Sequence, residues 1–233
     1  MNETIEQYKI IRSARRKTAA IQVDEKGVSV RVPVWVTDQW VRDWVNKKQD
    51  WIARQQAVMA QNLELFCLKT EKGAKFSFLG KEYVLDWCEG DRWDVHIQGD
   101  TLLVIMGKRR SSSKVDTERV EAFLKKWFKE QAVQIISERV SYWAYKMGVQ
   151  YKSLKYRSFK RKWGSCSARG EITLNWRLVF AVKNIIDYVV IHELSHLTHL
   201  NHSPRFWALV EKYCPDWREK RSYLQSKNAW VLW

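Results

Sequence analysis

Four of the five histidines in this 233-residue chain lie between residues 192 and 202. His192 and His196 are four positions apart, so on a helix their side chains lie one turn apart and about 40° from each other around the axis. Both imidazoles can therefore reach one metal ion, and Glu193, beside the first of them, can reach a water on that ion. This His-Glu-x-x-His spacing is typical of zinc hydrolases. It requires a helix that supplies two ligands and a second part of the chain that completes the site.

The residues around this motif predict two helices joined by a tight turn. Residues 185–191 are apolar and suit a buried helix that ends near residue 200, with Asn201 in the left-handed conformation that often follows a helix. Ser203, followed by proline, has the form of an N-cap that opens a second helix. His202 then lies in the turn, where it can reach the same metal as the first two histidines.

The third protein ligand has three candidates. We favour His202, because its offset of ten from His192 is that of the third histidine in metzincin proteases, although His199 occupies their glycine position. Glu211, on the following helix, is a carboxylate alternative. On a continued helix His199 points the right way but lies more than about 10 Å along the axis from His192. A histidine-rich helix end without metal is the remaining interpretation.

A site with three protein ligands and one water is the form of a catalytic Zn²⁺ site, whereas a structural site has four protein ligands. The sequence therefore predicts Zn²⁺ held by His192, His196 and His202, with Glu193 as the catalytic carboxylate.

Composition limits where the chain functions and what it binds. Hydrophobic residues make up 45% of the chain and no segment approaches a transmembrane span. The first residues lack the form of a signal peptide, and the four cysteines contain no Cys-x-x-Cys pair, which indicates a cytoplasmic protein without a cysteine-based zinc site. The net charge of +15 favours an anionic partner such as nucleic acid, a membrane surface or an acidic protein, unless it serves only solubility.

The order of predicted elements indicates an α+β protein with two domains. Residues 1–106 read as a mostly β domain with one helix, residues 107–115 as a polar linker, and residues 116–233 as a second domain that holds the zinc site. The elements expected in the first domain are strands at 19–23, 28–34, 76–87, 93–98 and 101–106, and a helix that begins at Thr37 or Asp38 and carries Trp40, Val41, Trp44, Val45, Trp51 and Ile52 on one face. In the second domain we expect a long helix over 116–147 ended by Gly148, strands at 154–167 and 171–176, and the motif helix.

A basic run precedes the motif helix. Lys155, Arg157, Lys160 and Lys162 interleave with aromatic residues, and the run between residues 152 and 162 has no acid. This is the best candidate for contact with nucleic-acid phosphates. The alternative is a solvated edge strand whose positive charge discourages strand pairing.

Several motifs occur together in a fixed order. They are Lys162-Trp163-Gly164-Ser165-Cys166-Ser167, Ile172-Thr173-Leu174-Asn175-Trp176-Arg177-Leu178, the segment from Asp187 to His196, and Asn201-His202-Ser203 with Phe206-Trp207. The set resembles the YgjP-like metallopeptidase family over nearly the whole chain. The resemblance implies a compact zincin-like C-terminal domain that binds zinc through His192, His196 and His202, with Glu193 as the catalytic carboxylate.

This chain departs from the family pattern at two positions outside the metal site. Lys162 stands where the family usually has arginine, and Val182 where it usually has proline. The family also looks like a relative of SprT-like and WLM-type proteases, which act on proteins crosslinked to DNA.

The sequence thus predicts a zinc-dependent peptidase acting on a peptide or protein. The strand beginning at Trp163, Gly164 and Ser165 is a candidate for pairing with substrate backbone, or else an internal strand of the sheet. Asn175 and Arg177 are further candidates for substrate binding. The alternative function is a nucleic-acid-binding protein with a structural or vestigial zinc site, or a protease recruited to DNA.

Overall fold

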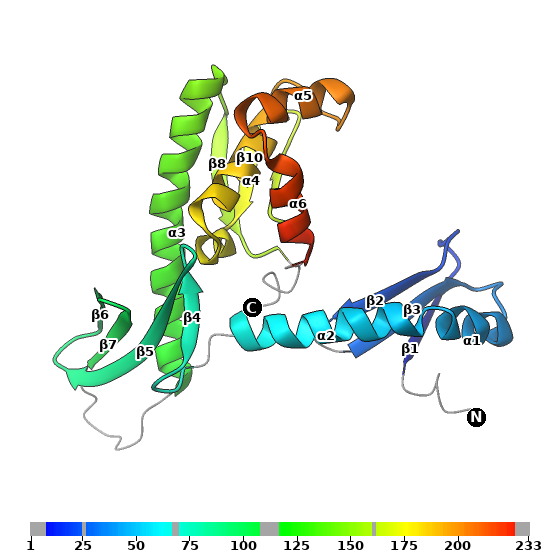
Figure 1. Cartoon of the computed structure of the whole chain (residues 1–233), viewed down its shortest axis with the longest axis horizontal. Helices are drawn as coiled ribbons and strands as arrows, with labels where there is room; N and C mark the ends of the chain where they lie inside the picture. Colours follow the sequence, from blue (N-terminus) through cyan, green and yellow to red (C-terminus); the bar gives the residue numbers. More distant parts are fainter. Residues whose placement is uncertain (1–7, 25–26, 67–69, 108–116, 160–161, 227–233) are drawn as a thin grey trace. The chain divides into compact units, whose positions relative to one another are not determined.

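The computed structural model describes residues 8–24, 27–66, 70–107, 117–159 and 162–226, without the side chains of 24, 58–66, 117 and 226 (Figure 1). The chain forms two compact units, residues 1–64 and residues 65–231. Within the described residues it has six α-helices and three sheets. No described helix combines the length and the apolar character needed to cross a membrane.

The first unit contains a three-stranded sheet and two helices. Its elements are β1 (Lys9–Ser13), β2 (Ala20–Asp24), β3 (Gly27–Pro33), α1 (Asp38–Asn46) and α2 (Gln49–Phe66), the last of which continues past the unit boundary. The strand order is β1-β3-β2, with β1 parallel and β2 antiparallel to β3. Strand β1 was not predicted from the sequence.

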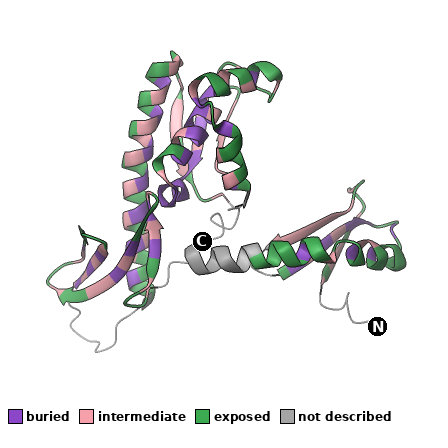
Figure 2. Ribbon diagram, viewed as in Figure 1, coloured by how far each residue is buried: buried purple, intermediate pink, exposed green. Residues whose placement is uncertain are grey.

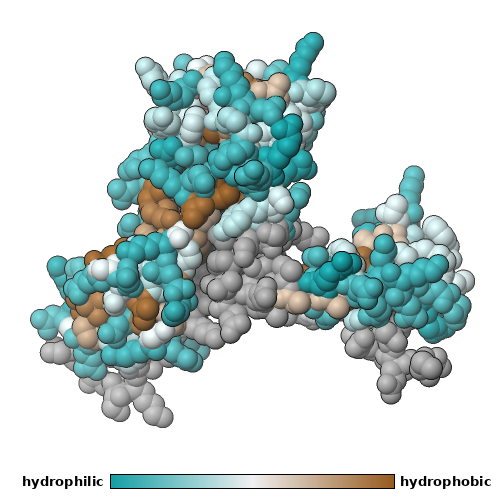
Figure 3. All heavy atoms as spheres, viewed as in Figure 1, coloured by the Kyte–Doolittle hydropathy of each residue, from teal (hydrophilic) through white to brown (hydrophobic). Residues whose placement is uncertain are grey.

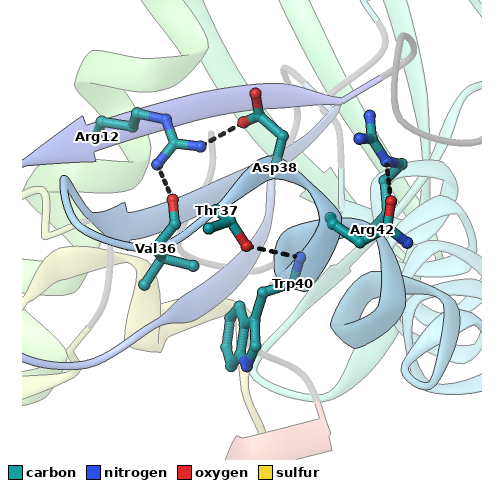
Figure 4. A network of polar contacts seen from close by, with 7 residues as sticks. Arg12, Val36, Thr37, Asp38, Trp40 and Arg42 are labelled. Carbon is teal, nitrogen blue, oxygen red and sulfur yellow. Dashed lines mark hydrogen bonds and ion pairs between the residues drawn. The ribbon is translucent and has the colours of Figure 1, made fainter.

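The core of this unit follows the predicted alternation. Val30 and Val32 of β3 are fully buried, as are Val41 and Val45 of α1 and Ile52 of α2. The side chain of Thr37 accepts a hydrogen bond from the backbone of Trp40, which confirms the predicted N-cap, and Arg12 binds both Val36 O and Asp38 beside it (Figure 4).

The predicted single helix of the first unit is wrong in two respects. The chain forms two separate helices, with the break after Asn46, and the side chains of Trp40 and Trp51 are 45% and 40% exposed rather than buried. The valines one turn apart at 41 and 45 face the sheet, so Trp40 lies at the flank of the helix, where it stacks on Trp44 at 5.4 Å.

The second unit holds a four-stranded sheet, a long helix, a three-stranded sheet and three shorter helices. They are β4 (Lys75–Phe78), β5 (Lys81–Gly90), β6 (Asp94–Gln98), β7 (Thr101–Gly107), α3 (Thr117–Met147), β8 (Ser153–Arg157), β9 (Gly164–Cys166), β10 (Glu171–Asn175), the 3₁₀ helix η1 (Trp176–Phe180), α4 (Lys183–Ser195), α5 (Pro204–Tyr213) and α6 (Trp217–Ser226). The larger sheet has the order β4-β5-β7-β6 and the smaller one β8-β10-β9.

Helix α3 joins the two sheets into one core. Every fourth residue from Val120 to Ala144 is buried, which forms an unbroken stripe along the helix (Figure 2). Phe128 in its N-terminal half contacts Phe76 and Phe78 of the larger sheet, and its C-terminal half is joined to α4 through Arg139 and Asp187. Figure 3 shows apolar residues gathered between the larger sheet and the helices above it, whereas most of the visible surface is hydrophilic.

This shared core explains why the observed division differs from the predicted linker at 107–115. The polar run there has the composition of a linker, and residues 108–116 lie outside the described residues. The sheet before it and the helix after it nevertheless belong to one hydrophobic cluster. The boundary between the compact units instead falls within α2, near residue 64.

The predicted strand over 154–167 is also divided. Strand β8 pairs parallel to β10 and β9 pairs antiparallel to it, so the chain must leave the sheet between them. The side-chain amide of Asn175 donates to the carbonyls of Phe159 and Lys162, at 3.1 and 3.3 Å, and so holds this crossing segment.

Candidate metal centre and catalytic cleft

Helix α4 carries the first half of the site. Most of its residues are buried, and the helix is fixed to α3 by the ion pair of Arg139 with Asp187, whose two contacts measure 2.5 and 2.9 Å. This pair sets the position of the helix that presents His192 and Glu193.

The end of α4 is tighter than predicted. The helix ends at Ser195 rather than near residue 200, and the following residues form turns, with Leu197 N bonded to Leu194 O and His199 N to Ser195 O. Asn201 does not have the left-handed conformation, because the turns have already satisfied the last carbonyls of the helix. The backbone carbonyl of His199 lies 3.1 Å from Nδ1 of His196 and orients that ring.

Helix α5 brings the third histidine to the site. Ser203 caps the helix by accepting a hydrogen bond from Phe206 N, and proline occupies its first turn, as predicted. The buried ring of Phe206 then lies 4.9, 4.6 and 4.8 Å from the ring centres of His192, His196 and His202. Trp207 stacks on His202 at 5.5 Å. The rings of Phe206 and Trp207 therefore pack against the imidazoles and help to hold them in position.

The three histidines converge. Their nearest ring nitrogens all lie within 4.8 Å of one another, and Nε2 of His192 lies 3.1 Å from Nε2 of His202. Two nitrogens bound to one tetrahedral zinc at about 2.0–2.1 Å would be roughly 3.3 Å apart, so the spacing fits a shared ion. Burial, with the neighbouring His196 and His202, lowers the pKa of His192 to about 3, which keeps its imidazole neutral and able to bind metal.

The other two candidates for third ligand lie elsewhere. Among the described residues, His192, His196 and His202 are the group whose geometry could hold a metal. Glu211 instead forms an ion pair with Arg218 at 2.5 Å, and His199 contributes its backbone carbonyl rather than its ring to the site.

Glu193 is buried beside the histidines, with 5% of its surface exposed. Burial raises its pKa to about 8, and the positive charge of Lys162 opposes that shift. A Cβ atom built on Gly164 would lie only 2.5 Å from Oε1 and 2.6 Å from Cγ of Glu193. Strand β9 therefore passes close to the carboxylate, and a Cβ at position 164 would displace either the strand or the Glu193 side chain.

A cavity of about 230 Å³ opens next to these residues. The described residues that line it come from three segments: Lys162, Trp163 and Gly164 at β9, Tyr188, Val189, His192 and Glu193 of α4, and Arg221, Leu224 and Gln225 of α6. Burial raises the pKa of Tyr188 to about 12, so its hydroxyl stays protonated. Helix α6 and its Arg221 were not predicted from the sequence, because a ten-residue segment of mostly polar composition carries little signal of what it packs against.

The structure separates the predicted substrate-binding residues. Trp163 and Gly164 line the cavity, and Ser165 follows them in β9. Asn175 and Arg177 are buried and, among the described residues, do not belong to the cavity wall. Asn175 uses its amide to hold the segment before β9 and its carbonyl to accept from Arg177 N, which is a supporting position behind the site.

The predicted nucleic-acid contacts are also separated. Lys155 and Arg157 lie on the edge strand β8, where Lys155 pairs with Glu171 at 3.6 Å. Lys162 lies at the cavity, and Lys160 is outside the described residues.

Comparison with known proteins gives a family model and two structural neighbours. The model described as YgjP-like, metallopeptidase domain matches residues 17–227. The zymogen of the metallopeptidase abylysin from Pyrococcus abyssi is 26% identical, with a TM-score of 0.37, over 40% of this chain and 93% of abylysin. The corresponding values for the zymogen of jannalysin from Methanocaldococcus jannaschii are 21%, 0.35, 40% and 95%. No curated protein matches the chain.

Proposed function

Because the chain belongs to the YgjP-like metallopeptidase family, we propose that it is a zinc-dependent enzyme that hydrolyses peptide bonds with Glu193 as general base. Family membership makes the chain a metallopeptidase, and so a hydrolase. The observation that supports the finer proposal is the convergence of three histidine nitrogens, one of them from His192, which lines a cavity together with the buried carboxylate of Glu193.

His192, His196 and His202 would hold the zinc. Imidazole nitrogen is a preferred zinc ligand, and three protein ligands leave the fourth position open, which is the pattern of catalytic sites. When bound, zinc supplies a Lewis acid that polarises a carbonyl and lowers the pKa of water. The carbonyl of His199 keeps the ring of His196 turned so that its other nitrogen faces the site.

Glu193 would move the proton. Its ionised form accepts a proton from the attacking water, and its protonated form donates that proton to the leaving amine. A raised pKa helps the first step, because a carboxyl group that is hard to ionise is a stronger base once it is ionised. The contact with Gly164 holds the carboxylate on the cavity side of β9.

Strand β9 would hold the substrate. Among the described strands it pairs with β10 alone, so its other edge can accept an extended peptide through backbone hydrogen bonds. Trp163 and Gly164 at its start line the same cavity as Glu193 and His192. A peptide added to this edge would therefore pass the catalytic carboxylate.

The alternative function is nucleic-acid binding by a protein whose zinc site is structural or vestigial, and a third possibility is a DNA-associated protease. The net charge of +15 favours an anionic partner. Of the described candidate phosphate contacts, however, Lys155 already pairs with Glu171 and Lys162 lines the cavity. A buried carboxylate beside the metal ligands also has no use in a structural zinc site. The peptidase is therefore the better supported proposal.

Metal analysis and a cleavage assay test the proposal together. The purified protein should contain about one zinc per chain and should cleave a peptide or protein substrate. A chelator should abolish cleavage, and added zinc should restore it, with or without DNA in the reaction. Full zinc occupancy without cleavage of any substrate in a broad peptide library would contradict the peptidase and favour the binding protein.

A further inference from the structure

The cavity wall is cationic. Two basic side chains, Lys162 before β9 and Arg221 of α6, line it from different segments. Its one acidic lining residue among those described is Glu193, which is almost wholly buried. A substrate that enters this cavity therefore meets two exposed positive charges and no exposed negative charge from the described wall.

Arg221 is held in place by aromatic packing. Its guanidinium lies 5.0 Å from the ring centre of Trp207, and Trp207 stacks on Trp217 at 4.1 Å with an interplanar angle of 15°. Trp207 also stacks on the metal-site residue His202. The arginine is thus fixed relative to the candidate metal centre through a single intervening ring.

The hydrogen-bond donors of Arg221 are not used within the described part of the protein. No ion pair or hydrogen bond joins its guanidinium to another described residue, and the side chain is exposed. Arg218, one turn earlier on α6, differs in this respect because it forms an ion pair with Glu211. A planar guanidinium has five donors in a fixed fork that matches a carboxylate, so Arg221 is free to bind one.

We propose that Arg221 binds a carboxylate of the substrate, and that the enzyme therefore prefers peptides with a carboxylate near the scissile bond. This inference rests on the proposed peptidase function and deepens it. The carboxylate is either the free carboxy-terminus of the peptide or an acidic side chain, since both present the same two oxygens. Lys162 contributes a second positive charge without the fork and strengthens the preference for an anion.

The inference can be tested by measuring peptide affinity. The full-length chain carrying Glu193→Gln is used with zinc bound, because this variant should bind peptides without cleaving them. Three fluorescent peptides of one neutral sequence would be compared: one amidated, one amidated with a single added glutamate, and one with a free carboxy-terminus. We expect one of the two carboxylate peptides to bind roughly tenfold more tightly than the neutral peptide, which identifies the source of the carboxylate.

Substitutions on α6 show whether Arg221 causes this preference. Arg221→Gln should lower the affinity for the preferred carboxylate peptide to about that for the neutral peptide while zinc stays bound, and Arg221→Lys should keep part of the preference. Arg218→Gln is the matched control, because it removes the same charge from the same helix away from the cavity, and it should leave all three affinities unchanged.

Equal affinity for the three peptides would overturn the inference, as would an equal loss from Arg221→Gln and Arg218→Gln. The outcome is separable from that of the proposed function. Cleavage by the wild-type protein without any carboxylate preference would leave the peptidase standing and reject the role of Arg221. An Arg221-dependent preference without cleavage of any peptide would support this role and reject the peptidase.

Discussion

Gly164 is the residue whose replacement should most directly disturb the candidate catalytic carboxylate. A Cβ at this position would lie within 2.8 Å of Oε1, Cγ and Cδ of Glu193, closer than such atoms are normally found. Gly164→Ala must therefore push Glu193 or β9 aside. A misplacement of about 1 Å near a reacting group costs on the order of 10²-fold in rate, so we expect a loss of that size in kcat/KM.

The measurement for Gly164→Ala combines kinetics with zinc content. Because the substitution touches none of the three histidines, the zinc content should remain near that of the wild type. An alanine variant with wild-type kcat/KM would show that the contact between β9 and Glu193 does not position the carboxylate.

The roles of the histidines can be separated by comparing two alanine variants. His202→Ala removes one of the three converging nitrogens, whereas His199→Ala leaves the backbone carbonyl that orients His196 in place. We expect His202→Ala to lower zinc affinity sharply and His199→Ala to leave it unchanged, as measured by zinc content after dialysis against a competing chelator. Equal losses in the two variants, or full zinc in His202→Ala, would contradict the ligand assignment.

At this scale, arrangements that follow from local spacing could be predicted from the sequence. His192 and His196 share a helix turn, and Ser203-Pro204 opens a helix just after His202, so their convergence could be anticipated. Arg221 could not be predicted, because its place at the cavity depends on how α6 packs against Trp207. Asn175 was predicted to contact the substrate. Its amide instead supports the segment before β9, and the residues around it in the sequence give no sign of this role.

At the scale of elements, the ion pair between Arg139 and Asp187 should stabilise the packing of α4 on α3. Its side chains are only 18% and 17% exposed, and the contact is bidentate. Asp187→Asn leaves the guanidinium without its charged partner, so we expect a loss of about 1–3 kcal/mol in the free energy of unfolding. Urea denaturation would measure it, and a double-mutant cycle with Arg139→Gln should show coupling between the two residues.

A surface ion pair on the same helix provides the control for Asp187→Asn. Lys126 and Glu130 are 3.8 Å apart, with side chains 75% and 60% exposed. Because solvent screens such pairs, Glu130→Gln should cost less than about 0.5 kcal/mol. A loss as large as that of Asp187→Asn would show that the difference in burial between the two pairs does not govern stability.

Elements with a strong local pattern were predicted well. The long helix was expected over 116–147 and is observed over Thr117–Met147, with Gly148 in the left-handed conformation after it. The expected strand over 154–167 was wrong, because the segment between β8 and β9 is drawn out of the sheet by Asn175, which is distant in sequence. Strand β1 was missed, since its pairing partner β3 begins about twenty residues later.

At the scale of the whole molecule, each compact unit has its own hydrophobic cluster. One cluster is built on β3, α1 and Ile52, and the other joins the four-stranded sheet, α3 and the helices α4 and α5 that carry the candidate metal centre. A fragment of residues 65–233 should therefore fold alone and bind zinc like the full chain. Circular dichroism, thermal unfolding and zinc titration would test this, and an unfolded or zinc-free fragment would contradict the independence of the second unit.

The α+β class could be predicted from the sequence, whereas the division into units could not. Polar, small and basic residues around 107–115 have the composition of a linker, but the side chains of Phe76, Phe78 and Phe128 pack together across it. The boundary near residue 64 lies inside a helix, where composition gives no sign of a break. The division into units depends on packing between residues that are far apart in the sequence, which local sequence patterns do not predict.

The central claim is that Glu193 performs proton transfer at a zinc held by the three histidines, and Glu193→Gln tests it most directly. Glutamine has the size of glutamate but cannot accept the proton of water, and the imidazole ligands are unchanged. We predict full zinc content, an unchanged thermal unfolding temperature, and a fall of roughly 10²-fold or more in chelator-sensitive peptide cleavage. Cleavage by Glu193→Gln at the wild-type rate, with zinc bound, would contradict the account.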